Sequence, residues 1–159
     1  IDIRVDLNPP YQLCFASYSM GMMNLGETIS KMQAVTDGTV AIFWHAGDQP
    51  YDREAAILYP LLQNRKFVPV PKSNIIFNYL YQIGIYPNVK HLQSEQNKQY
   101  TTLDEAIETY SESYKVTSMD QKEKLREYLS QRLIPVDGGL MMKSVHNGMM
   151  IWWKVEKWK

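Results

Sequence analysis

This sequence of 159 residues has one cysteine, no net charge and no long apolar run. The one cysteine, Cys14, cannot form a disulfide within the chain, and there is no cysteine cluster for a zinc site. Basic and acidic residues both number 17, so charge does not favour binding to nucleic acid or to an anionic membrane. No apolar run approaches the roughly 20 residues of a membrane span, and no signal-peptide pattern is seen. These absences predict a cytoplasmic protein that binds neither nucleic acid nor membrane.

The length of the chain is enough for one domain with a sizeable core. The sequence begins with Ile1 instead of Met and soon enters an apolar run, with no glycine-rich turn before it. From this start we expect a fragment of a longer protein.

Two apolar runs, residues 11–17 and 39–45, flank a segment with helical spacing, residues 24–35. Continuous apolar strands joined by a helix are typical of a parallel sheet covered on both faces, because a half-exposed strand alternates apolar with polar residues. The pattern therefore predicts a βαβ unit within a three-layer α/β fold.

Hydroxyl and imidazole side chains stand where these two predicted strands end. Ser17, Tyr18 and Ser19 follow the first apolar run, and His45 follows the second. Ligands of parallel sheets bind at the carboxyl ends of the strands, so these residues are the first candidates for a site.

The rest of the chain alternates helix and strand signals. Helices are predicted at residues 51–64 and 74–83, and a strand is predicted at residues 88–92. Capping boxes at Thr102 and Ser118 open two further amphipathic helices, which end near residues 116 and 133.

The last part of the chain contains Asn147-Gly148, a strong hairpin signal. It predicts a turn between strands at residues 140–146 and 149–158.

Four segments together resemble the second half of a class I S-adenosylmethionine-dependent methyltransferase: residues 11–21, 39–47, 77–89 and the strand around Trp152-Trp153. The resemblance covers most of the chain. It implies a Rossmann-like mixed sheet of seven strands, in which the last strand is antiparallel and lies between the fifth and the sixth.

The resemblance also assigns each predicted strand a place in that sheet. The fourth, fifth, sixth and seventh strands correspond to residues 11–17, 39–45, 88–92 and 149–158. Residues 1–159 would form a single domain, the carboxyl-terminal half of the methyltransferase, with a helical insertion at residues 101–133.

The glycine-rich loop that approaches the methionyl part of the cofactor in this family has no counterpart here. No acidic residue is clearly placed to hold the ribose hydroxyls. We therefore expect this chain to contribute acceptor-side loops to a methyltransferase that binds S-adenosylmethionine only in its full-length form. The chain alone is expected to be inactive and without a cofactor.

The resemblance implies site residues beside the two central strands. Ala16, Ser17 and Tyr18 would border the cofactor, while Ser19 and Trp44 would contact the substrate. The neutral charge favours a small molecule or a protein as the methyl acceptor.

Three further side chains are candidates, each with a simpler alternative. His45 could be the catalytic base because histidine titrates near neutral pH, or it could be a packing residue. Met22 could belong to a flexible lid over the substrate, or could cover the end of the sheet. Tyr79 could line an aromatic substrate pocket, although its helical spacing is typical of a core residue. The histidines lack metal-ligand spacing, so no metal is expected.

Two other functions compete with this interpretation. Residues 8–11, Asn8-Pro9-Pro10-Tyr11, match the motif of methyltransferases that modify planar amino groups. The simpler alternative is a turn whose conformation the two prolines determine. Alternatively, the chain is a non-enzymatic interaction module. An open apolar strand at the sheet edge would then pair with a second copy to form a homodimer.

Overall fold

The computed structural model describes residues 9–19 and 24–156, which divide into two compact units. Unit 1 takes its residues from the ranges 1–47, 71–92 and 147–159. Unit 2 consists of residues 48–70 and 93–146.

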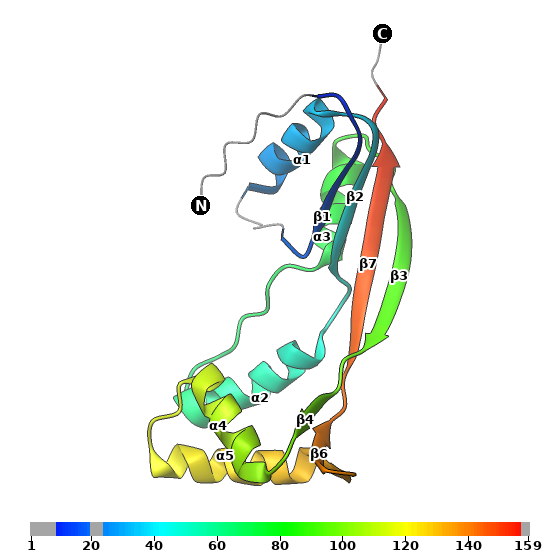
Figure 1. The fold of residues 1–159 in the computed structure, drawn as a ribbon. Helices are drawn as coiled ribbons and strands as arrows, with labels where there is room; N and C mark the ends of the chain where they lie inside the picture. Colours follow the sequence, from blue (N-terminus) through cyan, green and yellow to red (C-terminus); the bar gives the residue numbers. More distant parts are fainter. Residues whose placement is uncertain (1–8, 20–23, 157–159) are drawn as a thin grey trace. The chain divides into compact units, whose positions relative to one another are not determined.

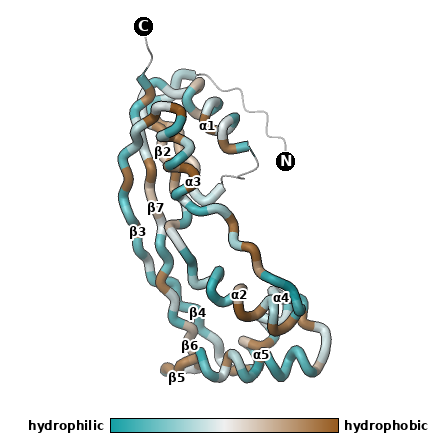
Figure 2. Tube along the Cα trace, turned by 180° about the vertical axis from the view of Figure 1, so that it is seen from behind, coloured by the Kyte–Doolittle hydropathy of each residue, from teal (hydrophilic) through white to brown (hydrophobic). Residues whose placement is uncertain are grey.

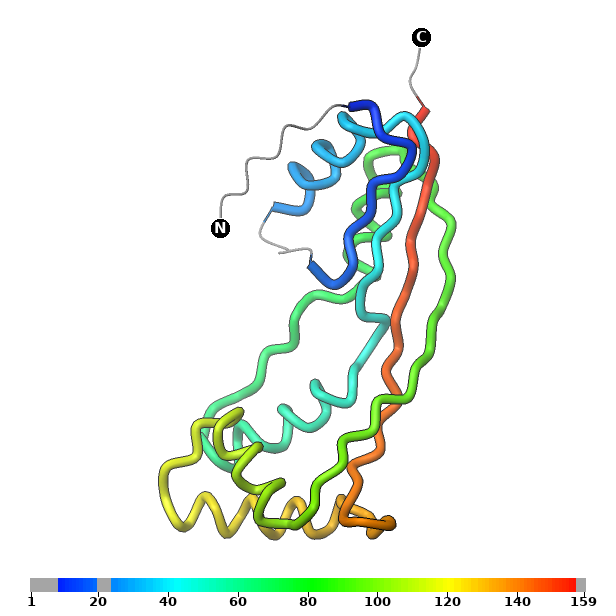
Figure 3. Tube along the Cα trace, in the orientation of Figure 1, coloured from blue at the N-terminus to red at the C-terminus, as the bar shows by residue number. Residues whose placement is uncertain are grey.

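Unit 1 contains most of a mixed sheet of four strands in the order β1-β2-β7-β3 (Figure 1). The strands are β1 (Tyr11–Ser17), β2 (Thr36–His45), β3 (Asn88–Glu95) and β7 (Val145–Lys154). β1 is parallel to β2, whereas β7, the last strand of the chain, runs antiparallel to β2. Figure 3 traces the four strands in this order across the sheet. The α/β class, the mixed sheet and the antiparallel last strand are as the sequence predicts.

Two helices of unit 1, α1 (Leu25–Ala34) and α3 (Ser73–Gln82), cover the same face of this sheet. Val40, Ile42 and Trp44 alternate along β2 and therefore point to one face. They form one buried cluster with residues of α1, α3 and β7, namely Ile29, Met32, Ile76, Leu80, Ile151 and Trp153. The core of unit 1 therefore lies between the sheet and these helices.

The opposite face of β1 corrects the expectation that the sheet is covered on both sides. Leu13 and Phe15 are 56% and 63% exposed, and they pair with Thr39 and Ala41 of β2. Of the three layers expected, the described residues of unit 1 form two. The apolar sequence of a strand indicates that burial of its surface is favourable. It does not indicate that the same chain supplies the residues that bury it.

Unit 2 contains the helices α2 (Pro50–Gln63), α4 (Leu103–Tyr114) and α5 (Met119–Arg132). Its small antiparallel sheet has the order β4-β6-β5, with β4 (Lys98–Tyr100), β5 (Ile134–Val136) and β6 (Gly139–Met142). Thr102 and Ser118 cap α4 and α5, so the helical insertion predicted at residues 101–133 is observed. A core of aliphatic and tyrosine side chains joins the three helices.

The predicted hairpin at Asn147-Gly148 is wrong. Both residues lie inside β7, and Gly148 pairs with His45 of β2. The tight turn lies earlier, between β5 and β6, where Val136 pairs with Gly139. Gly138 has a φ of +83° there, a backbone conformation that favours glycine.

The strands of the four-stranded sheet also differ in hydropathy. β3 is mostly exposed along its length, and Figure 2 shows it as predominantly hydrophilic. Within the described residues, we find no helix whose length and apolar character would let it cross a membrane.

Candidate functional site

The carboxyl ends of β1 and β2 lie side by side because the two strands are parallel. Ser17 pairs with Phe43, and the backbone N–H of Tyr18 donates a hydrogen bond of 3.1 Å to the Phe43 carbonyl. Tyr18 has a φ of +49°, so the chain turns sharply as soon as β1 ends. This turn places the Tyr18 side chain at the sheet edge where the sequence predicts a site.

Tyr18, Trp44 and His45 form a cluster of rings at this edge, referred to below as the aromatic cluster. The ring centroids of Tyr18 and His45 are 4.9 Å apart, and those of Trp44 and His45 are 5.4 Å apart. Tyr18 and Trp44 stack at 6.4 Å. Three predicted site residues are therefore brought together, Tyr18 just after β1 and Trp44 and His45 at the end of β2.

Trp44 is fixed by a contact from outside the two strands. Its Nε1–H donates a hydrogen bond of 2.8 Å to the Pro71 carbonyl, just before α3, and the side chain is buried. Tyr18, by contrast, is 49% exposed. The cluster thus has a buried, anchored member and a member that can contact a ligand.

Gly148 of β7 is a neighbour of the cluster that the sequence did not indicate. A Cβ atom at this position would lie 2.5 Å from the Tyr18 hydroxyl oxygen. A residue without a side chain is needed here for Tyr18 to keep its position. The Asn147-Gly148 pair was interpreted as a turn, which hid this packing role.

The chemistry available at this edge is aromatic and basic. The faces of aromatic rings attract cations, and Tyr18 has a half-exposed ring. His45 adds a half-buried imidazole, the side chain that most often serves as a general acid or base in enzymes. The edge is thus suited to a planar or positively charged group beside a proton acceptor.

The other predicted site residues are placed as follows. Ala16 is half-buried and Ser17 exposed at the end of β1, and Ser19 is exposed after Tyr18. Met22 lies outside the described residues.

Tyr79 packs against α1, where a Cβ on Gly26 would lie 2.5 Å from its hydroxyl oxygen. Within the described residues, no ring contact joins it to the aromatic cluster. In the motif of residues 8–11, Asn8 also lies outside the described residues, while Tyr11 begins β1.

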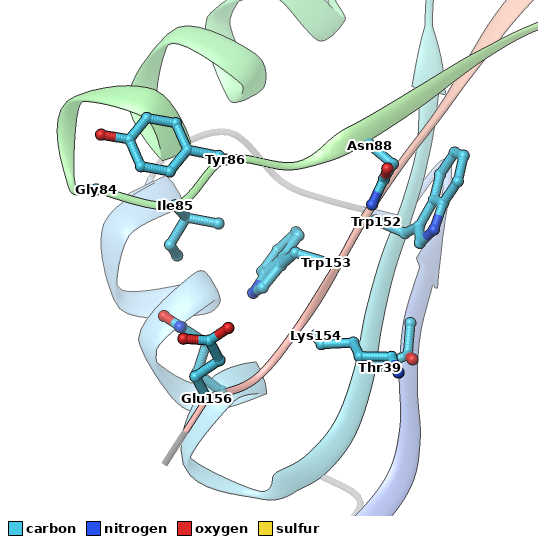
Figure 4. Close-up of a pocket in the computed structure, with 10 residues that line it drawn as sticks. Thr39, Gly84, Ile85, Tyr86, Asn88, Trp152, Trp153, Lys154 and Glu156 are labelled. Carbon is cyan, nitrogen blue, oxygen red and sulfur yellow. The ribbon is translucent and has the colours of Figure 1, made fainter. Parts of the chain in front are cut away.

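A cavity of about 440 Å³ lies at the other end of the sheet, near the amino end of β2 (Figure 4). It forms there because β7 is antiparallel, which pairs Lys154 at its carboxyl end with Thr39 of β2. Residues from α1, β2, β3, β7 and the segment after α3 line it. Figure 4 shows Trp152 and Trp153 on opposite sides of β7. The rule that ligands lie at carboxyl ends of parallel strands did not predict this cavity.

Metal binding receives no support from the part of the chain that the structure describes. No group of three or more histidine, cysteine, aspartate or glutamate side chains gathers there in a way that could hold an ion.

Comparison with known proteins identifies the fold. No family model matches the chain, and no curated protein matches its sequence. The solved structures with a similar fold include that of a Bacillus halodurans protein described as "a putative methyltransferase", with a TM-score of 0.50 and 10% sequence identity. The match covers 97% of this chain and 68% of that protein. At this identity the likeness concerns the fold alone: the chain has a methyltransferase-like α/β fold with a mixed sheet.

Proposed function

We propose that this chain supplies the acceptor side of an S-adenosylmethionine-dependent methyltransferase. The observation that carries the proposal is the aromatic cluster at the carboxyl ends of β1 and β2. The sheet order, with an antiparallel β7 beside β2, and the fold of the similar structure support it.

The residues at this edge fit one end of the cofactor. S-adenosylmethionine would supply an electrophilic methyl group on a positively charged sulfonium. The half-exposed Tyr18 ring can face that charge, and Ala16 and Ser17 can border it. None of the predicted site residues is a carboxylate that could hold the ribose hydroxyls. On this proposal the chain alone therefore binds the cofactor weakly or not at all, and is inactive by itself.

The remaining residues of the edge would act on the acceptor. Methyl transfer is a displacement, so the protein mainly holds the acceptor nucleophile in line with the methyl group. Ser19 and Trp44 would orient it. His45 would take its proton if the acceptor carries one of high pKa. The neutral charge of the chain favours a small molecule or a protein as this acceptor.

Titration calorimetry with S-adenosylmethionine tests the proposal on this chain and on a version extended upstream in its reading frame. We expect binding only by the extended version. Replacing Tyr18 with alanine there should weaken binding about 3-fold to 30-fold, the range of one cation–π contact.

Two results would contradict the proposal in different ways. Micromolar binding by this chain would show that its own residues form a whole cofactor site. Binding by neither version would contradict the proposal that the chain is part of a methyltransferase. Lys124→Met, a change on the surface of α5, is the matched control for the replacement of Tyr18 with alanine.

A second function is favoured by the exposed apolar residues of β1. Leu13 and Phe15 lie on the outermost strand of the sheet, whose outer edge pairs with no other strand among the described residues. β1 has the sequence Tyr-Gln-Leu-Cys-Phe-Ala-Ser, without a charged residue that would oppose pairing with an identical strand. The chain would then be a homodimerisation module without activity of its own.

A further inference from the structure

Unit 2 contains a carboxylate that two buried tyrosines hold in place. The Tyr110 hydroxyl donates a hydrogen bond of 2.8 Å to Oε2 of Glu54, and the Tyr114 hydroxyl donates one of 3.1 Å to Oε1. Both tyrosines are on α4 and only 3% exposed, and their rings stack at 6.1 Å. Glu54 itself is half-buried on α2.

These contacts hold the Glu54 carboxylate in place and leave it able to bind a further group. Burial, together with the charge of Glu54, raises the pKa of both tyrosines, so their hydroxyls remain donors over the usual pH range. A carboxylate has about four acceptor positions, and the tyrosines occupy two. Glu54 is therefore a fixed negative charge with acceptor positions to spare.

Three cationic side chains share a cavity with Glu54. Lys98 of β4, Arg132 of α5 and Lys143, just after β6, line a cavity of about 80 Å³ together with Glu54 and His146. A second cavity of about 80 Å³ adjoins it, because Glu54 and Lys98 line both.

Among the residues that the structure describes, these three cations have no acidic partner. Lys98 lies 5.7 Å from the centre of the Tyr110 ring, and Arg132 lies 5.7 Å from that of Tyr128. No ion pair joins Lys98, Arg132 or Lys143 to a carboxylate within the described residues.

The charge around the cavity is opposite to that of the unit. Unit 2 has 10 basic and 12 acidic residues, whereas the cavity has three basic residues and one acidic residue. Like charges repel, so a group of unpaired cations around a hollow indicates a place for an anion. A simple anion would also meet the charge of Glu54, and a simple amine would meet the cations.

We propose that unit 2 binds a small zwitterion, with its ammonium group on Glu54 and its anionic group among Lys98, Arg132 and Lys143. Water takes about 30 Å³ in the liquid, so two adjoining cavities of this size suit a ligand of a few heavy atoms. An α-amino acid with a small side chain carries both charges within a few heavy atoms. The proposal does not depend on the methyltransferase assignment.

Chemical-shift titration of the full chain with glycine, acetate and methylamine tests this proposal. Glycine should bind in a saturable way, with shifts in Tyr110 and Lys98. Acetate and methylamine, which each have one of the two charges, should bind at least about tenfold more weakly, the loss expected when one charged contact is removed. Equal binding of acetate and glycine would overturn the zwitterion, as would the absence of saturable glycine binding.

Variants separate a binding role from a structural one. Glu54→Gln and Lys143→Met should each weaken glycine binding about tenfold or more. Lys124→Met, on the same unit but not lining either cavity, should leave binding unchanged. Glu54→Gln also changes the hydrogen-bonded contact between α2 and α4. Lys143 is exposed, so its replacement should not alter folding. If Lys143→Met binds glycine as well as the unaltered chain does, the proposal fails.

Discussion

At the scale of single residues, the candidate site depends on a glycine as much as on its aromatic rings. The Tyr18 hydroxyl oxygen occupies the space that a Cβ on Gly148 would need. Tyr18 is half-exposed, so its ring can swing away at little cost. The geometry of the aromatic cluster is therefore more sensitive to Gly148 than the stability of the fold is.

Gly148→Ala should displace Tyr18 from His45 while changing the free energy of unfolding by less than about 1 kcal/mol. The measurement is the ring-current shift of the His45 imidazole protons by NMR, with urea unfolding beside it. Adding Tyr18→Phe removes the hydroxyl, and its ring carbon Cζ would be 3.8 Å from the new Cβ, an ordinary contact. The double variant should restore the shift. Unchanged His45 signals in Gly148→Ala would show that the ring contact does not depend on Gly148.

At the scale of elements, α2 and α4 are joined by Glu54 and its two tyrosines. Both tyrosines have a raised pKa in the folded state, because of burial first and of the Glu54 charge second. The folded chain therefore keeps these protons when the unfolded chain, with tyrosine pKa values near 10, releases them. The stability that they contribute is fully present below about pH 10 and is lost as the pH rises further.

We expect the free energy of unfolding to fall above about pH 10, by about 1.4 kcal/mol per pH unit for each tyrosine. Urea unfolding between neutral pH and about pH 11.5 measures this slope. The matched control is Tyr110→Phe with Tyr114→Phe, which should show a smaller slope by about two such contributions. Tyr51, Tyr100, Tyr128 and the lysines are present in both proteins, so most of their contribution cancels in the difference. Equal slopes would contradict the assigned shifts.

At the scale of the whole molecule, the uncovered face of β1 decides between the two candidate functions. A homodimerisation module should have twice the 18.6 kDa mass of the chain in light scattering. Phe15→Lys, which places a charge on the edge strand, should return it to a monomer. Val68→Lys, a change at another exposed apolar residue, should not. A mass of 18.6 kDa at high concentration would contradict the dimer.

Elements with local causes can be predicted from the sequence alone. The apolar run predicted β1 with the bounds observed, and the capping boxes at Thr102 and Ser118 predicted the helical insertion. Parallel strands also placed Tyr18 and His45 at the same edge of the sheet, where the structure brings their rings together. These features depend on side-chain periodicity, on caps within four residues and on one rule of sheet topology.

Features that depend on pairs of residues far apart in the sequence follow from the packing of the folded chain. Gly148 is a strand residue because it pairs with His45, more than 100 positions earlier, and this pairing overrides the local turn preference of Asn147-Gly148. The helices cover one face of the sheet, which apolar spacing cannot specify. Glu54 meets Tyr110 and Tyr114 across 56 and 60 residues. Such contacts form only when packing brings separate elements together, so no local pattern in the sequence records them.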